Sequence, residues 1–396
     1  METSPSAEVG RDDLHILQCA KDIRPGGGVC GVAHELEGQF SSLGIPSSRF
    51  TLRSLGPTQF SGWAPRSLIL RKLALLWDVV FFSTVGTLVL ALKTRRKRGV
   101  VTITHDDALV GDILINHGLH RAMLLNSGHP WRMLLRNPLH PFLLVREWVR
   151  FRLRIHRRVV CFSESEAELL LKHYPRASGR VEIISNGVDL DRFYPNKSAG
   201  IAARVALGIS KGDFTIIFVG HEFERKGLAI LIDAVASLPA HVKLLVVGDV
   251  ADGAARPYRE LATAKGLQDR VRFLGRRTDV AALINGADAL VMPTAFESWA
   301  LVGLEAMACG VPVLMPLVGG ISEYLRDGEN GLVIERNATD AARKIRRLLD
   351  DPQLRSRLAT RARETALAFS WPKVARQYVD LATKVLSERQ AADARR

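Results

Sequence analysis

The stretch TIIFVGHEFERKGLAILIDAV, residues 215–235, contains the pair of elements that decides the fold. A short, β-branched apolar run ends in a glycine, and an apolar pattern of helical period follows it. This order is typical of a buried strand that turns into a helix. Because the same pairing recurs along the chain, the sequence predicts βαβ units on parallel sheets.

The predicted strands form two series, separated by a polar stretch at residues 196–200. We therefore expect two doubly wound, Rossmann-like α/β domains over residues 1–195 and 205–370, which bind ligands at the carboxyl ends of their strands. Residues 371–396 are expected to form a C-terminal helix that crosses back to the first domain. The predicted strands are LHILQC (14–19), the region 49–52, VVTIT (100–104), DILIN (112–116), VVCFS (159–163), VEIIS (181–185), TIIFVG (215–220), KLLVVG (243–248), VRFLG (271–275), ALVMP (289–293), VPVLM (311–315) and GLVI (331–334).

The composition is that of a globular protein with an excess of positive charge. Apolar residues make up 47% of the 396 positions and charged residues 24%, which excludes a mostly disordered, collagen-like or coiled-coil chain. A net charge of +14 indicates an anionic neighbour such as nucleic acid, an anionic bilayer or a phosphorylated ligand. The four cysteines form no C-x-x-C pair, and the first residues are polar and acidic. We expect neither a disulfide framework nor a secretory signal, and place the protein in the cytoplasm or on the cytoplasmic face of the membrane.

Residues 73–92, LALLWDVVFFSTVGTLVLAL, are apolar enough to be confused with a membrane span. A charge, Asp78, and several Ser, Thr and Gly residues interrupt the stretch, and about 20 residues are only marginally enough to cross a bilayer. A buried helix of the first domain is the favoured interpretation. A helix that touches a membrane surface and a true span are the alternatives.

Two segments of the first half hold most of the excess charge. Five cations lie between residues 93 and 98, and eight arginines and one acid lie between residues 127 and 158. Within 142–157, Arg146, Arg150 and Arg154 form one helical stripe, while apolar residues form another. The segment is either a core helix with a solvated basic face or a surface for an anionic membrane or a phosphorylated glycolipid acceptor.

The block TAFESWALVGLEAMACGVPVLMPLVGGISEYL, residues 294–325, is the strongest candidate for a site. Glu297 follows a predicted strand, and Glu305 lies eight residues later in a helix expected to begin near Trp299. Eight helical residues rotate by about 800°, which would bring the two carboxylates to one side, two turns apart. The free N–H groups at the helix start suit a phosphate. The alternative is that both glutamates are ordinary surface residues.

This block resembles the E-x7-E signature of retaining glycosyltransferases of family four. That resemblance implies the GT-B fold, in which two facing Rossmann-like domains enclose a deep cleft. Other segments resemble the family in the same order along the chain. They are PGGG (25–28), SNGVDLDRFYP (185–195), VGHEFERKGLAILIDAV (219–235), VGGISEYL with DGENGLV, and FSWPKVARQYVDL (369–381). The resemblance is close in the C-terminal half and loose in the N-terminal half. Within the family, the sequence is loosely similar to lipopolysaccharide core glucosyltransferases.

The resemblance also implies roles for individual residues. Lys226 and Arg225, in the turn that follows Gly220, would hold the diphosphate of a nucleotide sugar, together with the helix start at Trp299, Ala300 and Leu301. Glu305 would bind the ribose, and Glu297 with His117 would bind the sugar. Gly27 and Gly28 would allow a close approach to the donor phosphate or the acceptor.

Two departures from the family pattern stand out. His221 occupies the position where the family often has an arginine, so we assign that role to Arg225. The usual E-G-F-G reads Glu297-Ser298-Trp299-Ala300, so any role that requires a positive φ at Ser298 or Ala300 is in doubt.

The expected activity is therefore a metal-independent transfer of a hexose, with retention, from a UDP- or GDP-linked sugar to a hydroxyl of a cell-envelope glycan or lipid-linked acceptor. No cofactor is expected. Asp189-Leu190-Asp191 matches a D-x-D metal motif, but it lies inside the resembling linker segment. A sugar-nucleotide epimerase or hydrolase of the same fold is the first alternative. A nucleic-acid-binding protein is the second, although it would leave the RKG turn and the two glutamates without a role.

Overall fold

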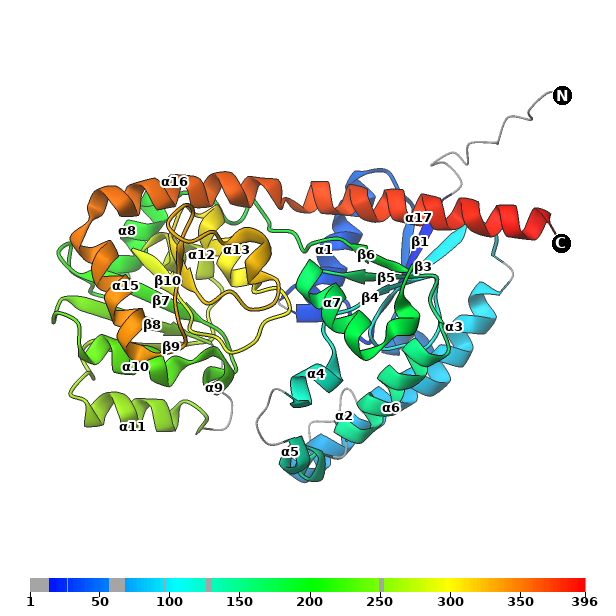
Figure 1. The fold of residues 1–396 in the computed structure, drawn as a ribbon, viewed down its shortest axis with the longest axis horizontal. Helices are drawn as coiled ribbons and strands as arrows, with labels where there is room; N and C mark the ends of the chain where they lie inside the picture. Colours follow the sequence, from blue (N-terminus) through cyan, green and yellow to red (C-terminus); the bar gives the residue numbers. More distant parts are fainter. Residues whose placement is uncertain are drawn as a thin grey trace. The chain divides into compact units, whose positions relative to one another are not determined.

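A computed structural model describes residues 14–26, 28–56, 68–95, 97–125, 130–137, 139–248 and 253–395. The chain divides into two compact units. Unit 1 comprises Met1–Ser185 and Trp371–Arg396, and unit 2 comprises Asn186–Ser370. In each unit, helices lie on both faces of one parallel sheet (Figure 1).

The sheet of unit 1 has the order β2-β1-β3-β4-β5-β6, and its neighbouring strands are parallel. Its order reverses between β1 and β3, so the carboxyl ends of these two strands form the topological switch point. The strands are β1 (His15–Cys19), β2 (Ser47–Phe50), β3 (Val100–His105), β4 (Ile113–Ile115), β5 (Arg158–Cys161) and β6 (Val181–Ile183).

The helices of unit 1 include the last helix of the chain, α17 (Trp371–Ala394). Arg389 on α17 donates to the carbonyl of Val100 at 2.7 Å and to Asp112 at 3.1 Å. These bonds attach the helix to the first residue of β3 and to the residue that precedes β4. A π-helical segment, Phe82–Gly86, joins α2 to α3. The other helices are α1 (Gly28–Ser42), α2 (Leu68–Phe81), α3 (Thr87–Thr94), α4 (His120–Leu125), α5 (Pro130–Arg136), α6 (Leu139–Arg152) and α7 (Glu164–His173).

Unit 2 repeats the architecture with the order β12-β11-β10-β7-β8-β9, and its switch point lies between β7 and β10. The strands are β7 (Phe214–Val219), β8 (Val242–Val247), β9 (Val271–Gly275), β10 (Ala289–Val291), β11 (Val313–Met315) and β12 (Leu332–Val333). The helices are α8 (Lys197–Ala206), α9 (Phe223–Lys226), α10 (Leu228–Ala236), α11 (Arg256–Ala264), α12 (Val280–Asn285), α13 (Leu301–Ala308), α14 (Ile321–Tyr324), α15 (Ala338–Asp350) and α16 (Pro352–Ala368).

The predicted fold class is confirmed, because each predicted strand forms and both sheets are doubly wound. The central strands are buried on both faces, which explains why they read as continuous apolar runs rather than alternating ones. The change from unit 1 to unit 2 comes after Ser185, ahead of the polar stretch at residues 196–200.

The interpretation of residues 73–92 as a buried helix is wrong. One side of α2 and α3 does pack on unit 1, through Val79, Phe82 and Leu90. The opposite side is exposed although it is apolar, with Leu88 61% and Leu92 64% accessible. By length and composition alone, Leu73–Thr94 could cross a membrane. The predicted core helix is therefore a surface helix with an apolar outer face.

The expectation that Arg146, Arg150 and Arg154 form one basic surface stripe is also wrong. The side chain of Arg150 is 4% exposed, and its Nη1 donates to Oδ1 of Asp106 at 3.1 Å. Arg146 lies 3.7 Å from the carboxylate of Asp107 and donates to Ser83 in the π-helical segment. Arg154 alone is exposed, just beyond the end of α6. The two inner arginines turn the basic side of α6 inward because two consecutive carboxylates after β3 receive them.

Candidate active site

The switch point of unit 2 brings Lys226 and Glu297 together. Lys226 is the last residue of α9, which follows β7, and Glu297 lies in the loop after β10. Because β7 and β10 are neighbours, the two loops leave the sheet side by side. Nζ of Lys226 donates to Oε1 of Glu297 at 2.7 Å, and Glu297 is 8% exposed. The pair is a largely desolvated ion pair at the edge where such sheets bind ligands.

Gly220 makes room for this contact. A Cβ at Gly220 would lie 2.3 Å from Cδ of Lys226 and 2.6 Å from its Cε, so a larger residue would displace the lysine side chain. The absence of a side chain at this position therefore sets the path by which Lys226 reaches Glu297.

Arg225 reaches the same carboxylate but is also held by other groups. Its Nη1 lies 3.3 Å from Oε1 of Glu297 and donates to the carbonyl of Phe296. Its Nε donates to Glu222 at 3.0 Å, and its Nη2 donates to the same carboxylate oxygen at 2.6 Å. The structure thus brings three of the predicted site residues, Arg225, Lys226 and Glu297, into one cluster. Thr294 belongs to the same cluster, because its hydroxyl lies 3.2 Å from Oε1 of Glu297.

The loop that carries Glu297 is shaped by two glycines that lie far along the chain. A Cβ at Gly319, whose φ is +54°, would lie 1.6 Å from the carbonyl oxygen of Glu297. A Cβ at Gly320 would lie 2.5 Å from both the carbonyl of Ser298 and the ring of Trp299. These contacts require the glycines at 319 and 320, and they bury Trp299 to 4% exposure.

The helix after Glu297 begins later than expected. Helix α13 starts at Leu301, with Ala300 as its N-cap at φ −2°, so Trp299 and Ala300 precede the helix. The expectation that it begins near Trp299 is wrong, and the rotation by eight helical residues does not apply to Glu297, which lies in the loop. Neither Ser298 nor Ala300 has a positive φ.

Glu305 lies on the second turn of α13 and is largely shielded from solvent. Burial raises the pKa of Glu305 to about 7, against the opposing effect of Arg192, while Asp189 adds to the rise. Lys226 opposes the rise as well, which places Glu305 in the electrostatic range of the Lys226 cluster. A carboxyl with this pKa can accept or donate a hydrogen bond near neutral pH.

The D-x-D match has a structural role in the turn before α8. Oδ1 of Asp189 accepts the backbone N–H groups of Asp191 and Arg192, each at 3.0 Å. Over the residues that the structure describes, no group of three or more His, Cys, Asp or Glu side chains is arranged to hold a metal ion. The Asp189 carboxylate therefore orders the loop that presents Arg192 toward Glu305.

In unit 1, His117 lies directly beyond β4 and is held by two neighbours. Its backbone N–H donates to Oδ2 of Asp106 at 3.1 Å, and its ring packs on His105 and on the edge of Phe162. His105, the last residue of β3, is fully buried. Burial lowers the pKa of His117 to about 3 and that of His105 well below its usual value, so both rings are neutral at physiological pH.

The hydrogen bonds fix which ring nitrogen of each histidine carries the proton. The amide nitrogen of Gln18 donates to the carbonyl of Ala33, which turns Oε1 of Gln18 toward Nε2 of His105 at 2.9 Å. His105 therefore carries its proton on Nε2 and accepts at Nδ1, and the donor to Nδ1 is Nε2 of His117 at 3.2 Å. His117 then donates from Nε2 and has its acceptor lone pair at Nδ1.

The predicted turn at residues 25–28 comes between β1 and the start of α1 in the chain. Gly28 begins α1 with a φ of +70°, a conformation that favours glycine, and Gly27 lies outside the described residues.

Comparison with known proteins shows the family. Two family models match consecutive parts of the chain: Glycosyltransferase Family 4 over residues 29–192, and Glycosyl transferases group 1 over residues 201–365. The chain belongs to the family-4 glycosyltransferases. The resemblance found in the E-x7-E block is thereby confirmed, and it extends to the N-terminal half.

Curated relatives of this family-4 chain include D-inositol 3-phosphate glycosyltransferases. The protein of Salinispora tropica is 36% identical over 248 residues, which are 58% of this chain and 52% of the relative. The protein of Corynebacterium glutamicum is 33% identical over 230 residues, 55% of each chain. The chain thus spans about half the length of the curated relatives it matches.

Solved structures share the fold over nearly the whole chain. WaaG, a glycosyltransferase involved in lipopolysaccharide biosynthesis, has a TM-score of 0.73 at 21% identity, covering 93% of this chain and 99% of WaaG. Sucrose-phosphate synthase from Thermosynechococcus elongatus has a TM-score of 0.74 at 22% identity, covering 96% and 100%. HepE of Anabaena, in complex with UDP and glucose, has a TM-score of 0.67 at 22% identity, covering 94% and 100%. The family-4 chain therefore has the GT-B fold.

Two acids beside His117 were missed from the sequence. Asp106, which follows β3, binds both Arg150 and the backbone of His117. Glu166, on the first turn of α7, accepts from the amide of Asn116 at 2.8 Å and from the N–H of Phe162 at 2.8 Å, and burial raises its pKa to about 8. The S-x-x-E pattern of Ser163 and Glu166 was a detectable signal, because it predicts a helix N-terminus immediately after a strand.

Proposed function

We propose that this protein transfers a hexose, with retention and without a metal ion, from a nucleotide diphosphate sugar to a hydroxyl of a glycan or lipid-linked acceptor. The observation that carries the proposal is the cluster of Arg225, Lys226 and Glu297 at the switch point of unit 2, in a chain of family 4. Two cations beside a desolvated carboxylate match a donor whose phosphates are anionic and whose sugar presents hydroxyls.

The first donor to test is UDP-glucose, because HepE, which shares the fold, has been solved with it. The diphosphate would compete with Glu297 for Lys226, so donor binding would free a carboxylate oxygen to accept from a sugar hydroxyl. Glu305, with its pKa of about 7, would accept from the ribose. The N–H groups at the start of α13 would meet the phosphate from the other side.

In the proposed reaction, the bond between the anomeric carbon and the diphosphate oxygen breaks while the acceptor oxygen bonds to the same face of that carbon. The acceptor proton moves to the departing diphosphate oxygen. Lys226 and Arg225 stabilise the negative charge that develops on this oxygen, which is why no metal ion is needed. For His117, a role in binding the sugar is proposed from its match to the family pattern.

We further propose that the protein works on the cytoplasmic face of a membrane. The support is the exposed apolar face of α2 and α3, which ends at the exposed cations Lys93, Arg95, Lys97 and Arg98. Apolar residues next to cations are the composition that binds anionic bilayer surfaces. An acceptor from the cell envelope, such as a polysaccharide or lipopolysaccharide precursor, would be met at that surface.

Thermal unfolding in the presence of candidate ligands tests the proposal. We expect UDP-glucose or another UDP-, GDP- or ADP-linked sugar to raise the melting temperature, since a ligand that binds only the folded state stabilises it. Stabilisation by duplex DNA, with none by any nucleotide sugar, would overturn the proposal. Analysis of the products distinguishes transfer from the alternatives, because an epimerase or a hydrolase would turn over the donor with no acceptor present.

A further inference from the structure

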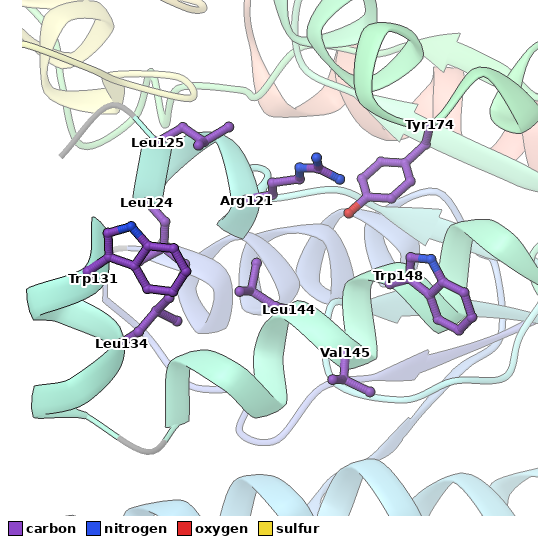
Figure 2. Close-up of a pocket in the computed structure, with 9 residues that line it drawn as sticks. All are labelled: Arg121, Leu124, Leu125, Trp131, Leu134, Leu144, Val145, Trp148 and Tyr174. Carbon is purple, nitrogen blue, oxygen red and sulfur yellow. The ribbon is translucent and has the colours of Figure 1, made fainter. Parts of the chain in front are cut away.

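Unit 1 carries an apolar groove that the proposed reaction does not use. Helices α4, α5 and α6 form it, and its volume is about 450 Å³. Figure 2 shows Trp131 and Trp148 at its two ends, with Leu144 and Val145 between them. Leu124, Leu125 and Leu134 also contribute to the apolar lining. The volume falls in the range of about 300–1,000 Å³ that is usual for small-molecule sites.

The groove leaves large apolar side chains in contact with water. Trp131 is 77% exposed, Val145 61% and Trp148 52%. For Val145 and Trp148 this exposure follows from the orientation of α6, whose arginines at 146 and 150 point inward to Asp107 and Asp106. Phe151 also lies on the inward side, in the core, whereas Val145 and Trp148 lie on the outward side. A concentrated apolar surface of this kind marks a binding site more often than a chance exposure.

The groove has one charged residue among those that line it, Arg121 on α4. Figure 2 shows its guanidinium directed toward the hydroxyl of Tyr174, at the end of the groove where Trp148 lies. That hydroxyl donates to Glu147 at 2.8 Å. A ligand that fills the groove would therefore have a long apolar part and an anionic group near Arg121.

The position of the groove relates it to the candidate site. Helix α4 begins at His120, three residues beyond His117, so Arg121 and Leu124 follow the strand end that presents His117. A ligand whose apolar part lies along α4 would have its polar end on the side of His117 within the same unit.

We propose that the groove binds the hydrocarbon chain of a lipid-linked acceptor whose phosphate lies beside Arg121. This inference rests on the proposed function and names its acceptor class. A second copy of the chain is a poorer occupant, because a symmetric contact would bring the exposed arginines at 121 and 132 of both copies together. Like charges in a contact oppose association, whereas a lipid phosphate is attracted.

Dodecyl phosphate, kept below its micellar concentration, is the probe for the full-length protein. We expect it to bind with a change in tryptophan fluorescence and in titration calorimetry. In the double variant Val145→Asp, Trp148→Ser, the dissociation constant should rise by about tenfold or more, because a charge and a lost indole remove the apolar lining. The matched control is Leu153→Ser, an equally exposed leucine outside the groove, which should bind as the wild type does.

Arg121→Gln tests the position of the phosphate. It should weaken dodecyl phosphate but leave the binding of uncharged dodecyl maltoside unchanged. Equal binding of dodecyl phosphate by wild type and the double variant would overturn the proposal, as would binding of inorganic phosphate as tight as that of dodecyl phosphate. A dimer in sedimentation velocity that the double variant abolishes, with no binding of dodecyl phosphate, would assign the groove to self-association instead.

Binding of UDP-glucose is measured on the same samples to separate the two proposals. It should be the same in all these variants, since the groove belongs to unit 1 and the Lys226 cluster to unit 2. If the double variant loses dodecyl phosphate binding but keeps UDP-glucose binding, its effect is confined to the groove. Wild-type protein that binds dodecyl phosphate and no nucleotide sugar would leave the groove in place and overturn the proposed function.

Discussion

The ammonium group of Lys226 donates a 2.7 Å hydrogen bond to Glu297, a residue 71 positions further along the chain. The strand order makes this contact, because β10 pairs with β7 and the two loops leave the sheet at the same edge. The cation predicted for the diphosphate and the carboxylate predicted for the sugar are thus partners before any donor is bound.

Replacing Lys226 by Met should weaken donor binding strongly while the fold survives. Arg225 remains 3.3 Å from Glu297, so the carboxylate keeps one counter-ion, and we expect a loss of unfolding free energy of about 1–3 kcal/mol. The affinity for UDP-glucose should fall by about 100-fold, measured by titration calorimetry, because the loss of a charge-assisted contact costs about 3 kcal/mol. Lys211→Met, at an exposed lysine that precedes β7 and so lies at the amino edge of the sheet, is the control. Wild-type affinity in Lys226→Met would remove the diphosphate assignment.

Glu305→Gln should make stability less dependent on pH. Burial raises the pKa of Glu305 to about 7 in the folded protein, above the value near 4.5 of an unburied glutamate. The stability that comes from the buried neutral carboxyl is present below about pH 4.5 and is lost as pH rises through 7. Between pH 5 and pH 8 the wild type should therefore lose about 2–3 kcal/mol more than Glu305→Gln does in urea unfolding. Parallel pH profiles of the two proteins would contradict the raised pKa.

Breaking the ion pair between Arg150 and Asp106 should destabilise the protein strongly. Arg150→Leu leaves the buried carboxylate of Asp106 without its main counter-ion, a change that costs about 3–5 kcal/mol. Adding Asp106→Asn to Arg150→Leu should recover part of this loss, because it removes the unpaired charge. Arg154→Ala, at the exposed end of the predicted stripe, should change the unfolding free energy by less than about 0.5 kcal/mol. Similar effects of the two arginine variants would contradict the buried pair.

Gln18→Leu should change the proton distribution in the ring of His117. Without Oε1 of Gln18, the N–H at Nε2 of buried His105 has no acceptor, which costs about 1–3 kcal/mol. The tautomers in which His105 carries its proton on Nδ1 and His117 carries its proton on Nδ1 then become accessible. Nitrogen NMR should show His117 protonated on Nε2 in the wild type and as a mixture in Gln18→Leu. An unchanged His117 spectrum in Gln18→Leu would show that Gln18 does not set the tautomer.

Much of the candidate site could be predicted because most of its residues lie shortly after strands. Lys226, Glu297 and His117 each follow an apolar run that predicts a buried strand, and parallel sheets collect such positions at one edge. Glu305 lies further on, in the helix that follows Glu297. The exact start of α13 could not be predicted. Trp299 reads as a helix residue by period, but it precedes the helix because Gly319 and Gly320, about 20 positions further on, pack against residues 297–299.

The prediction of a basic surface stripe was wrong because it considered the charges of one helix by themselves. Arg146 and Arg150 have the spacing of a solvent-facing stripe, and α6 considered alone would expose them. Asp106 and Asp107 lie about 40 positions earlier and are unremarkable in sequence, yet they bind both arginines and so hold Val145 and Trp148 on the outward side of α6. That orientation exposes the two residues that α6 contributes to the rim of the groove.

The sequence by itself determined the two parallel sheets and the family, because apolar runs, glycine turns and the E-x7-E spacing are local patterns that need no knowledge of distant contacts. Only the tertiary structure decided which side of α6 and of the α2–α3 helix faces water, and which loop residues meet Lys226. Those outcomes depend on the pairing of charges and the packing of glycines between segments far apart in the chain. A buried charge must find its partner wherever the fold places one, and no local pattern records where that is.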